Sequence, residues 1–233
     1  MRLSFYRDAL ALPAALLATS LQAEVITDFE AGSVAPFQSV GLVSVTDAFA
    51  PIDFYPEPIY APQGQFFANL DNAGGADASV VEAQLNLTPG TLDASRASAL
   101  VHELSVTAGQ QLTFLYNFER DSDTGNISTD NDRGLFIVDG QVFELGNMFT
   151  DNGPAFSSFT FRFEQSGSAQ FAFLAVEQLD PAPTPGSPRT GIDGDGLHAS
   201  LLIDDVRLIP EPSSLLILAT LAAGVTRRRP RRA

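Results

Sequence analysis

Apolar residues recur at every second position in many short segments of the chain. The clearest segment is 112–118, where Leu112, Phe114, Tyr116 and Phe118 fall on one face of an extended strand. Such alternation is typical of strands with one buried face. The ranges that we expect to be strands are 25–29, 38–45, 65–70, 79–87, 97–106, 112–118, 134–138, 141–145, 156–163, 169–176 and 199–209.

Turn residues separate these segments at intervals of about ten residues, which is typical of antiparallel sandwiches. Asp139-Gly140 predicts a two-residue hairpin turn. Only residues 94–103 fit a helix as well as a strand. Phenylalanine, with 18 copies and no Trp beside it, is the expected chief core residue. We therefore expect one all-β domain over residues 24–209, an antiparallel β-sandwich of the jelly-roll kind.

The first 23 residues have the layout of a signal peptide. Arg2 and Arg7 precede an apolar run over residues 9–18, and the small residue Ala23 follows it. Residues 1–23 are therefore predicted to form a signal helix that is removed on export. A buried N-terminal helix is the alternative.

The last 24 residues combine a turn, an apolar run and a basic cluster, the pattern of a transmembrane helix with a cytoplasmic cationic end. As a helix, residues 212–226 span roughly 22 Å, short of the about 30 Å of a hydrocarbon core. The anchor is therefore marginal, and snorkelling arginines would help it to span. An amphipathic surface helix is the alternative, but the run has no polar stripe. The anchor positions are Leu215, Leu216, Ile217, Leu218, Leu221 and Val225, and the basic positions are Arg227, Arg228, Arg229, Arg231 and Arg232.

Pro210-Glu211-Pro212 stands directly before this run, and the three parts in order resemble the PEP-CTERM sorting signal of Gram-negative bacteria. The resemblance implies export through the general secretory translocon and transient anchoring in the inner membrane by residues 210–233. It also implies cleavage near the triplet by the transpeptidase exosortase. The final location would be the cell surface or the medium, in systems that accompany exopolysaccharide and biofilm production.

Charge is distributed unevenly along the chain. Residues 24–211 hold 27 acidic residues and six Arg, a formal charge of −21, and there is no Lys. Such a surface repels nucleic-acid phosphates and argues against nucleic-acid binding, while it favours solubility and divalent cations. No cysteine is present, so disulfides and thiol catalysis are excluded. The chain also lacks the G-x-S-x-G and H-E-x-x-H motifs, and we expect that it is not an enzyme.

Parts of the domain resemble the sandwich ectodomains often attached to PEP-CTERM tails. Its two ends also resemble the first and last strands of galactose-binding-type jelly rolls, which are carbohydrate-binding domains. The stretches that carry the first resemblance are 112–119, 132–140, 156–161 and 200–208, and those that carry the second are 28–32 and 203–206.

The second resemblance implies that the first and last strands are neighbours and share a structural calcium ion. Its ligands would be Glu30 and one of Asp204 or Asp205, with backbone carbonyls completing the six to eight oxygens that calcium takes. Regular strand alternation puts Asp204 on the face of Leu202 and Val206, and Asp205 on the opposite face. An ion pair with the nearby arginine, or simple exposure, is the alternative for these acids. No other cofactor is expected.

Two further segments have candidate binding residues. The acidic loop 121–132 is interpreted as a solvated loop, with a second calcium site as the alternative. Tyr55 and Tyr60, in a Pro-rich stretch, are candidate platforms for a sugar ring, although the stretch also fits a rigid connection packed on the sheet. The function we expect is that of an exported, non-enzymatic cell-surface or matrix protein associated with exopolysaccharide. A carbohydrate-binding module is the alternative.

Overall fold

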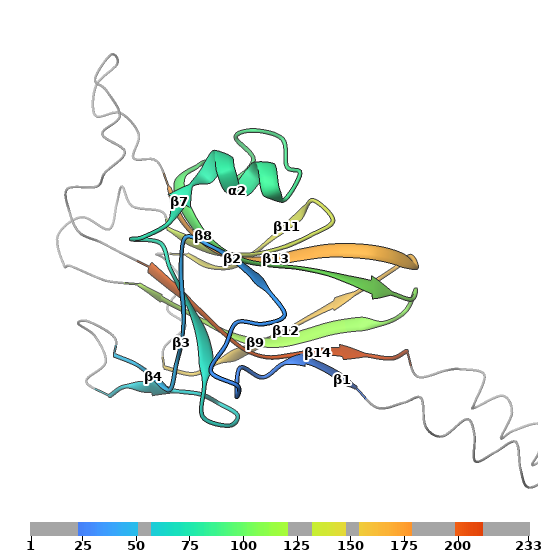
Figure 1. Ribbon diagram of the computed structural model, residues 1–233, viewed down its shortest axis with the longest axis horizontal. Coiled ribbons are helices and arrows are strands. Elements are labelled where there is room, and N and C mark those ends of the chain that lie inside the picture. Colours follow the sequence, from blue (N-terminus) through green and yellow to red (C-terminus); the bar gives the residue numbers. More distant parts are fainter. Residues whose placement is uncertain (1–22, 51–56, 121–131, 148–153, 179–198, 212–233) are drawn as a thin grey trace, which may run out of the picture.

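Two six-stranded antiparallel sheets pack face to face in the computed structural model of the protein (Figure 1). A two-stranded ribbon and one short helix lie on the outside of this sandwich. Every pairing between described strands is antiparallel, so the expected all-β antiparallel sandwich is confirmed. The structure describes residues 23–50, 57–120, 132–147, 154–178 and 199–211.

Sheet A has the strand order β12-β9-β14-β6-β3, with β1 also paired to β14. One edge of β14 is paired with β9 along most of its length. On its other edge, β6 pairs with the first part of β14 and β1 pairs with the last part. The first and last strands of the domain are therefore neighbours, as expected. The bounds are β1 Glu24–Thr27, β3 Leu42–Thr46, β6 Phe67–Asp71, β9 Gln111–Arg120, β12 Ser157–Arg162 and β14 Ala199–Ile209.

Sheet B has the order β11-β10-β13-β8-β2, with β7 also paired to β8. The expected hairpin turn at Asp139-Gly140 joins β10 to β11, and both residues have positive φ, as that turn requires. The bounds are β2 Gln38–Val40, β7 Ala76–Asp77, β8 Ala94–Val106, β10 Arg133–Val138, β11 Gln141–Asn147 and β13 Gly167–Gln178.

The segment expected as one strand over residues 38–45 is split, because the chain passes from sheet B to sheet A at Gly41. This glycine has φ +74°, and a Cβ there would lie 2.6 Å from Ser98 Oγ. The same hydroxyl accepts the Leu42 N–H (2.9 Å) and donates to the Asp71 carbonyl (2.6 Å). Only glycine allows the two sheets to approach so closely at this crossing.

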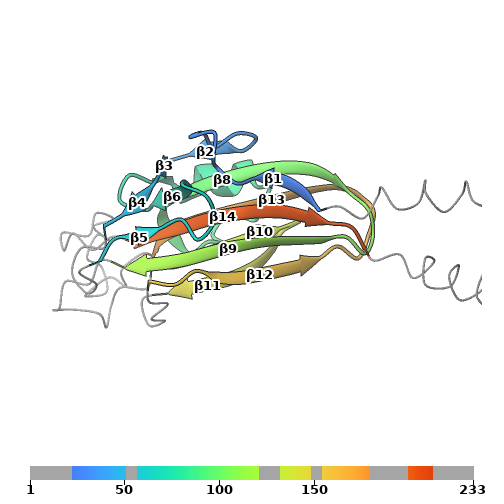
Figure 2. The same ribbon diagram turned by 90° about the horizontal axis from the view of Figure 1, so that it is seen from below.

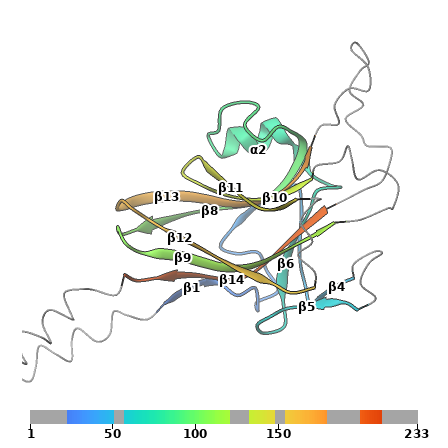
Figure 3. The ribbon, with the colours of Figure 1, turned by 180° about the vertical axis from the view of Figure 1, so that it is seen from behind.

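Helix α2 (Ala78–Gln84) replaces part of the strand expected over residues 79–87, and this prediction was wrong. The β-branched Val80 and Val81 suggested a strand, but Ala78, Val81 and Leu85 recur at helical spacing and are buried against the outer face of sheet B. Val80 points away from that face and is 52% exposed. Figure 3 shows α2 on the outer side of sheet B, and its contacts include β8 and β7. Residues 94–103, which fit either structure, belong to strand β8.

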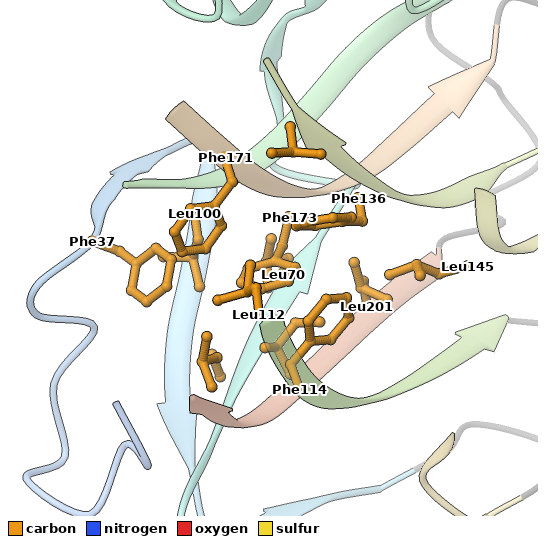
Figure 4. Close-up of a cluster of buried hydrophobic side chains, with 14 of the residues drawn as sticks. Phe37, Leu70, Leu100, Leu112, Phe114, Phe136, Leu145, Phe171, Phe173 and Leu201 are labelled. Atoms are coloured by element: carbon orange, nitrogen blue, oxygen red, sulfur yellow. The ribbon is translucent and has the colours of Figure 1, made fainter. Parts of the chain in front are cut away.

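Phenylalanine fills the space between the sheets, as expected (Figure 4). Phe114 of sheet A meets Phe173 and Phe136 of sheet B, with ring centroids 4.7 and 5.0 Å apart. Phe136 is completely buried and also contacts Phe159 at 5.4 Å. These inclined ring contacts are the favoured geometry for aromatic pairs.

The chain enters β1 and leaves β14 at the same end of the sandwich, here called the terminal pole (Figure 2). Glu24 pairs with Leu208 there. Strand β9 ends at the opposite pole, where β10 and β14 begin. The predicted signal helix, apart from Ala23, and the predicted anchor and basic positions lie outside the described residues. None of the helices in the described part of the chain is long and apolar enough to cross a membrane.

Replacing Phe136 by Ala is expected to lower the free energy of unfolding by about 3–5 kcal/mol, since it removes a ring at the centre of the core and leaves a cavity. Urea unfolding of the protein at neutral pH measures this loss. Val142→Ala, on the neighbouring strand at a side chain 42% exposed, is the matched control and should change stability by less than about 0.5 kcal/mol. Equal losses in both variants would contradict the aromatic core described above.

Candidate functional site

The outer face of sheet A brings together most of the described candidate residues. The central residue is Asp204 on β14, and the turn at residues 63–66 contacts both Asp204 and Glu30. The ribbon of β4 (Ala48–Phe49) and β5 (Ile59–Tyr60) covers the same face and carries Tyr60. The site is therefore built from three segments far apart in the sequence.

A bulge in β14 sets the direction of the two acids. Asp204 pairs with Leu115 and Arg207 with Thr113, so two residues of β14 stand opposite one of β9. Asp205, with φ +50°, occupies the bulge. The regular alternation that we expected is therefore wrong beyond Asp204, because Val206 packs in the core instead of sharing the outer face.

Asp204 is fully buried. One carboxylate oxygen accepts the Asp205 N–H at 2.7 Å, and the other accepts the Gln63 N–H at 3.4 Å. Burial, together with the carboxylates of Asp205 and Glu30, raises the pKa of Asp204 to about 7, although the two hydrogen bonds act in the opposite direction. Asp204 is thus a carboxyl group that gains a proton near neutral pH.

Glu30 holds the turn at residues 63–66 from the other side. Its Oε1 accepts the N–H groups of Gln65 (2.7 Å) and Phe66 (3.0 Å). Gly64 lies directly against this carboxylate, where a Cβ would clash with Oε1. Glu30 and Asp204 thus hold the same turn, and this is the pair of acids that the jelly-roll resemblance implied.

Asp205 forms an ion pair with Arg207, which was the alternative interpretation for this acid. Its Oδ1 lies 2.5 Å from Arg207 Nε. Arg207 also donates from Nη2 to Gln63 Oε1 at 3.2 Å, which links this ion pair to the same turn. Asp205 therefore stabilises the bulge through Arg207.

Calcium fits this place only in part. Glu30 and Asp204 offer two carboxylates on one turn, whereas calcium takes six to eight oxygens. In the described residues, no three His, Asp or Glu side chains are gathered closely enough to hold a metal ion. Backbone carbonyls would have to supply the remaining ligands, and the calcium site at Glu30 and Asp204 stays a prediction.

Tyr60 is 64% exposed on the outer side of the covering ribbon. Its neighbour Ile59 points the other way and is buried with Phe67 and Leu202 of sheet A. The described part of the Pro-rich stretch, from residue 57, thus packs on the sheet through Ile59, as one interpretation expected, and still presents one aromatic ring to solvent. Tyr55, the other candidate platform, lies outside the described residues.

A row of amides on the same face was not anticipated. Asn69 of β6 and Asn117 of β9 flank Leu202 of β14 in register. The Asn69 Oδ1 atom is buried, and no hydrogen-bond partner for it is found among the described residues. Period-two alternation places both asparagines opposite the core, but only the pairing of β14 with β6 and β9 brings them together.

At the opposite pole, Asp132 is part of a buried polar clasp. Asn72 Nδ2 donates to Asp132 at 2.5 Å, and Asn72 Oδ1 accepts the Ala199 N–H at 2.8 Å. Asp132 is 1% exposed, so the solvated-loop interpretation is wrong for this residue. Residues 121–131, the rest of that acidic loop, lie outside the described part of the chain.

The predicted sorting triplet begins at the terminal pole. Pro210 is half-buried and Glu211 is exposed, with its carboxylate 2.8 Å from Arg162 Nη2 of the edge strand β12. Both side chains of this pair are about half exposed, so the pair contributes little to stability. Pro212 lies outside the described residues.

No family model and no curated protein match this chain. Among solved structures, TmCBM61 in complex with β-1,4-galactotriose is similar over 81% of this chain and 99% of its own, at 16% identity and a TM-score of 0.43. The enzymatically active domain of tailspike protein 4 from bacteriophage CBA120 is similar over 78% of this chain and 20% of its own, at 10% identity and a TM-score of 0.37. Both TM-scores are too low to establish a common fold.

Asp204→Asn is expected to flatten the pH dependence of stability. The pKa is 3.8 for an ordinary aspartate and about 7 in the folded protein, so the folded state binds this proton more tightly. The contribution of Asp204 is thus fully present below about pH 4 and is lost as the pH rises through about 7, at a cost of about 4 kcal/mol as an upper limit. An amide cannot ionise, and its oxygen can still accept the Asp205 N–H.

Urea unfolding of both proteins from pH 4 to 8 measures the difference. Parallel profiles for the wild type and Asp204→Asn would contradict a raised pKa at this position. Repeating the series with millimolar Ca²⁺ tests the calcium prediction, since a bound cation should stabilise the wild type at pH 8 more than at pH 5. Glu30→Gln should remove that effect.

Proposed function

We propose that this chain is an exported, non-enzymatic protein of the cell surface or extracellular matrix, sorted through residues 210–233. In this proposal the translocon carries it across the inner membrane, the anchor holds it there transiently, and exosortase processes it at the triplet. The observation that best supports this is the position of the two chain ends at one pole of the sandwich.

The geometry suits a domain displayed on a membrane anchor. Ile209, the last residue of β14, pairs with Gln111 at the terminal pole, whereas Ala199 pairs with Arg120 at the opposite pole. An anchor that follows residue 211 would therefore hold the terminal pole at the membrane. The opposite pole and the exposed sides of the covering ribbon and of α2 would then remain accessible to a matrix partner.

The start of the triplet is also reachable by an enzyme. Glu211 is exposed, and its contact with Arg162 is a surface ion pair that water and salt weaken. A membrane transpeptidase could therefore bind the segment without unfolding the sandwich.

Carbohydrate binding is the second candidate function, in agreement with a matrix location. The exposed ring of Tyr60 favours it, because an aromatic face supplies a stacking surface for a sugar. Exopolysaccharide would be the ligand class, and the exposed side of the ribbon would be the binding surface.

Alanine at both Glu211 and Pro212 is expected to abolish processing in a host that carries an exosortase, because the sorting triplet is destroyed. Intact mass of the protein recovered from membranes and medium shows whether residues 227–233 remain attached. The matched control, Arg162→Ala, removes the ion pair but keeps the triplet and should be processed normally. Wild-type protein that retains its basic end in both fractions would refute the sorting proposal.

Tyr60→Ala is expected to weaken binding to the producing organism's exopolysaccharide about tenfold if Tyr60 stacks on a sugar, as for the loss of one good aromatic contact. Affinity electrophoresis in polysaccharide gels measures this for the intact protein. Val80→Ala, an exposed apolar position on α2 over the other sheet, is the matched control. If both variants bind the polysaccharide as tightly as the wild type, Tyr60 is not part of the binding site. If the wild type does not bind at all, the carbohydrate function is refuted.

A further inference from the structure

One side of the sandwich leaves strand edges of both sheets without a described partner. In sheet A, β1 pairs with β14 on one edge only. In sheet B, β13 covers one edge of β8, while β7 and β2 cover the other edge only at Arg96–Ala97 and at Ala99–Val101. The outer edge of β8 from residue 102 to 106 thus has no described neighbour.

A hollow of about 420 Å³ lies between these two edges. A water molecule occupies about 30 Å³ of liquid, so the hollow is large enough to take side chains. Apolar groups make up somewhat more than half of its lining, which comes from β1, β8, the end of β14 and the segment before β2. The lining residues are Val25, Ile26, Pro36, His102, Leu104 and Leu208, with Glu24 and Ser105.

His102 lines the hollow as an uncharged polar group. The His102 ring packs against both Phe37 and Phe171, with centroids 5.3 and 5.7 Å away. Burial lowers the pKa of His102, against the opposing effects of the Pro36 carbonyl and Glu103. The imidazole is therefore neutral at physiological pH, which leaves Glu24 as the charged residue of the lining.

Two acids, here called the rim, lie near the uncovered part of β8. Glu24 lines the hollow itself. Glu103 is exposed on the outer face of sheet B, where it accepts a hydrogen bond from Ser168 of β13 at 2.5 Å. Neither Lys nor Arg occurs in the lining, and the chain has a net charge of −15. A second copy would bring the same acids to the interface, so charge disfavours self-association here and favours a cationic partner.

We propose that this hollow, here called the edge groove, binds an extended segment of another protein in which apolar and basic residues alternate. The segment would add a strand beside β1 or along the uncovered part of β8, with main-chain hydrogen bonds to the exposed edge. Alternate side chains of a strand point to opposite sides. On β8 the apolar ones would therefore enter the hollow, while the basic ones would meet Glu103 on the outer face of sheet B. Glu24 adds negative charge to the hollow itself.

The segment has to be extended because unpaired strand edges border the groove. An unpaired strand edge presents a row of backbone N–H and C=O groups to any chain that lies alongside it. Val25, 48% exposed on β1, adds an apolar surface to that edge. A helix has free backbone groups only at its ends and could not pair along the edge, and a small ligand would leave most of the edge uncovered.

The probe is a synthetic eight-residue peptide of alternating Lys and Val, titrated against the full-length protein by calorimetry. We expect binding that weakens as salt is added, together with slowed amide hydrogen exchange at residues 24–27 or 103–106. The double variant Glu24→Arg/Glu103→Arg should bind about tenfold more weakly. The matched control, Glu144→Arg on the opposite edge strand β11, should bind like the wild type.

Two further peptides test the mode of binding. N-methylation of alternate residues removes the backbone donors of one edge and should abolish binding if a strand is added. An alternating Glu and Val peptide should not bind. The proposal would be overturned if the methylated peptide bound as tightly as the unmethylated one, or if the rim and control variants changed binding equally. Exchange protection at other residues would also overturn it. So would a dimer of the free protein that the rim variant dissociates, because the occupant would then be a second copy.

Discussion

The pairing of β14 with β9, β6 and β1 is the interaction on which the rest of the structure depends. It joins the end of the chain to its beginning and its middle within one sheet. The inner face of β14 supplies Leu201, Ile203 and Val206 to the core, and its outer face carries Leu202 under the covering ribbon. A defect in this strand would therefore affect the core, the turn at residues 63–66 and the position of residues 210–211 together.

The bulge at Asp205 shows how one extra residue places several groups. It returns Val206 to the core and leaves the buried Asp204 against the turn that Glu30 also holds. The ion pair of Asp205 with Arg207 fixes the bulge on its polar side. Burying a charged carboxylate beside two others costs folding free energy unless it is protonated or a cation is present. Proton uptake by this cluster is therefore coupled to the stability of sheet A.

Much of the fold could be predicted from period-two patterns because most strands have one face in the core. Leu112, Phe114 and Phe118 were placed correctly for that reason, and so was the turn at Asp139-Gly140. The pattern failed at residues 79–87, where β-branched residues belong to a helix, and at Gly41, where the constraint is a close approach to Ser98. The asparagine row, the bulge and the edge groove depend on which strands are neighbours, and a linear pattern does not contain that information.

The order in which the chain is made adds a consequence. Strand β14 is the last of the described strands to be synthesised. Its partner β1 is the first of them, so the two paired strands are separated by most of the domain's sequence. Closing such distant contacts is slow, because the chain must lose much of its freedom before any of them forms. Sheet A cannot close until residues 199–209 have left the ribosome. The complete sandwich can therefore form only after nearly all of the domain has been synthesised.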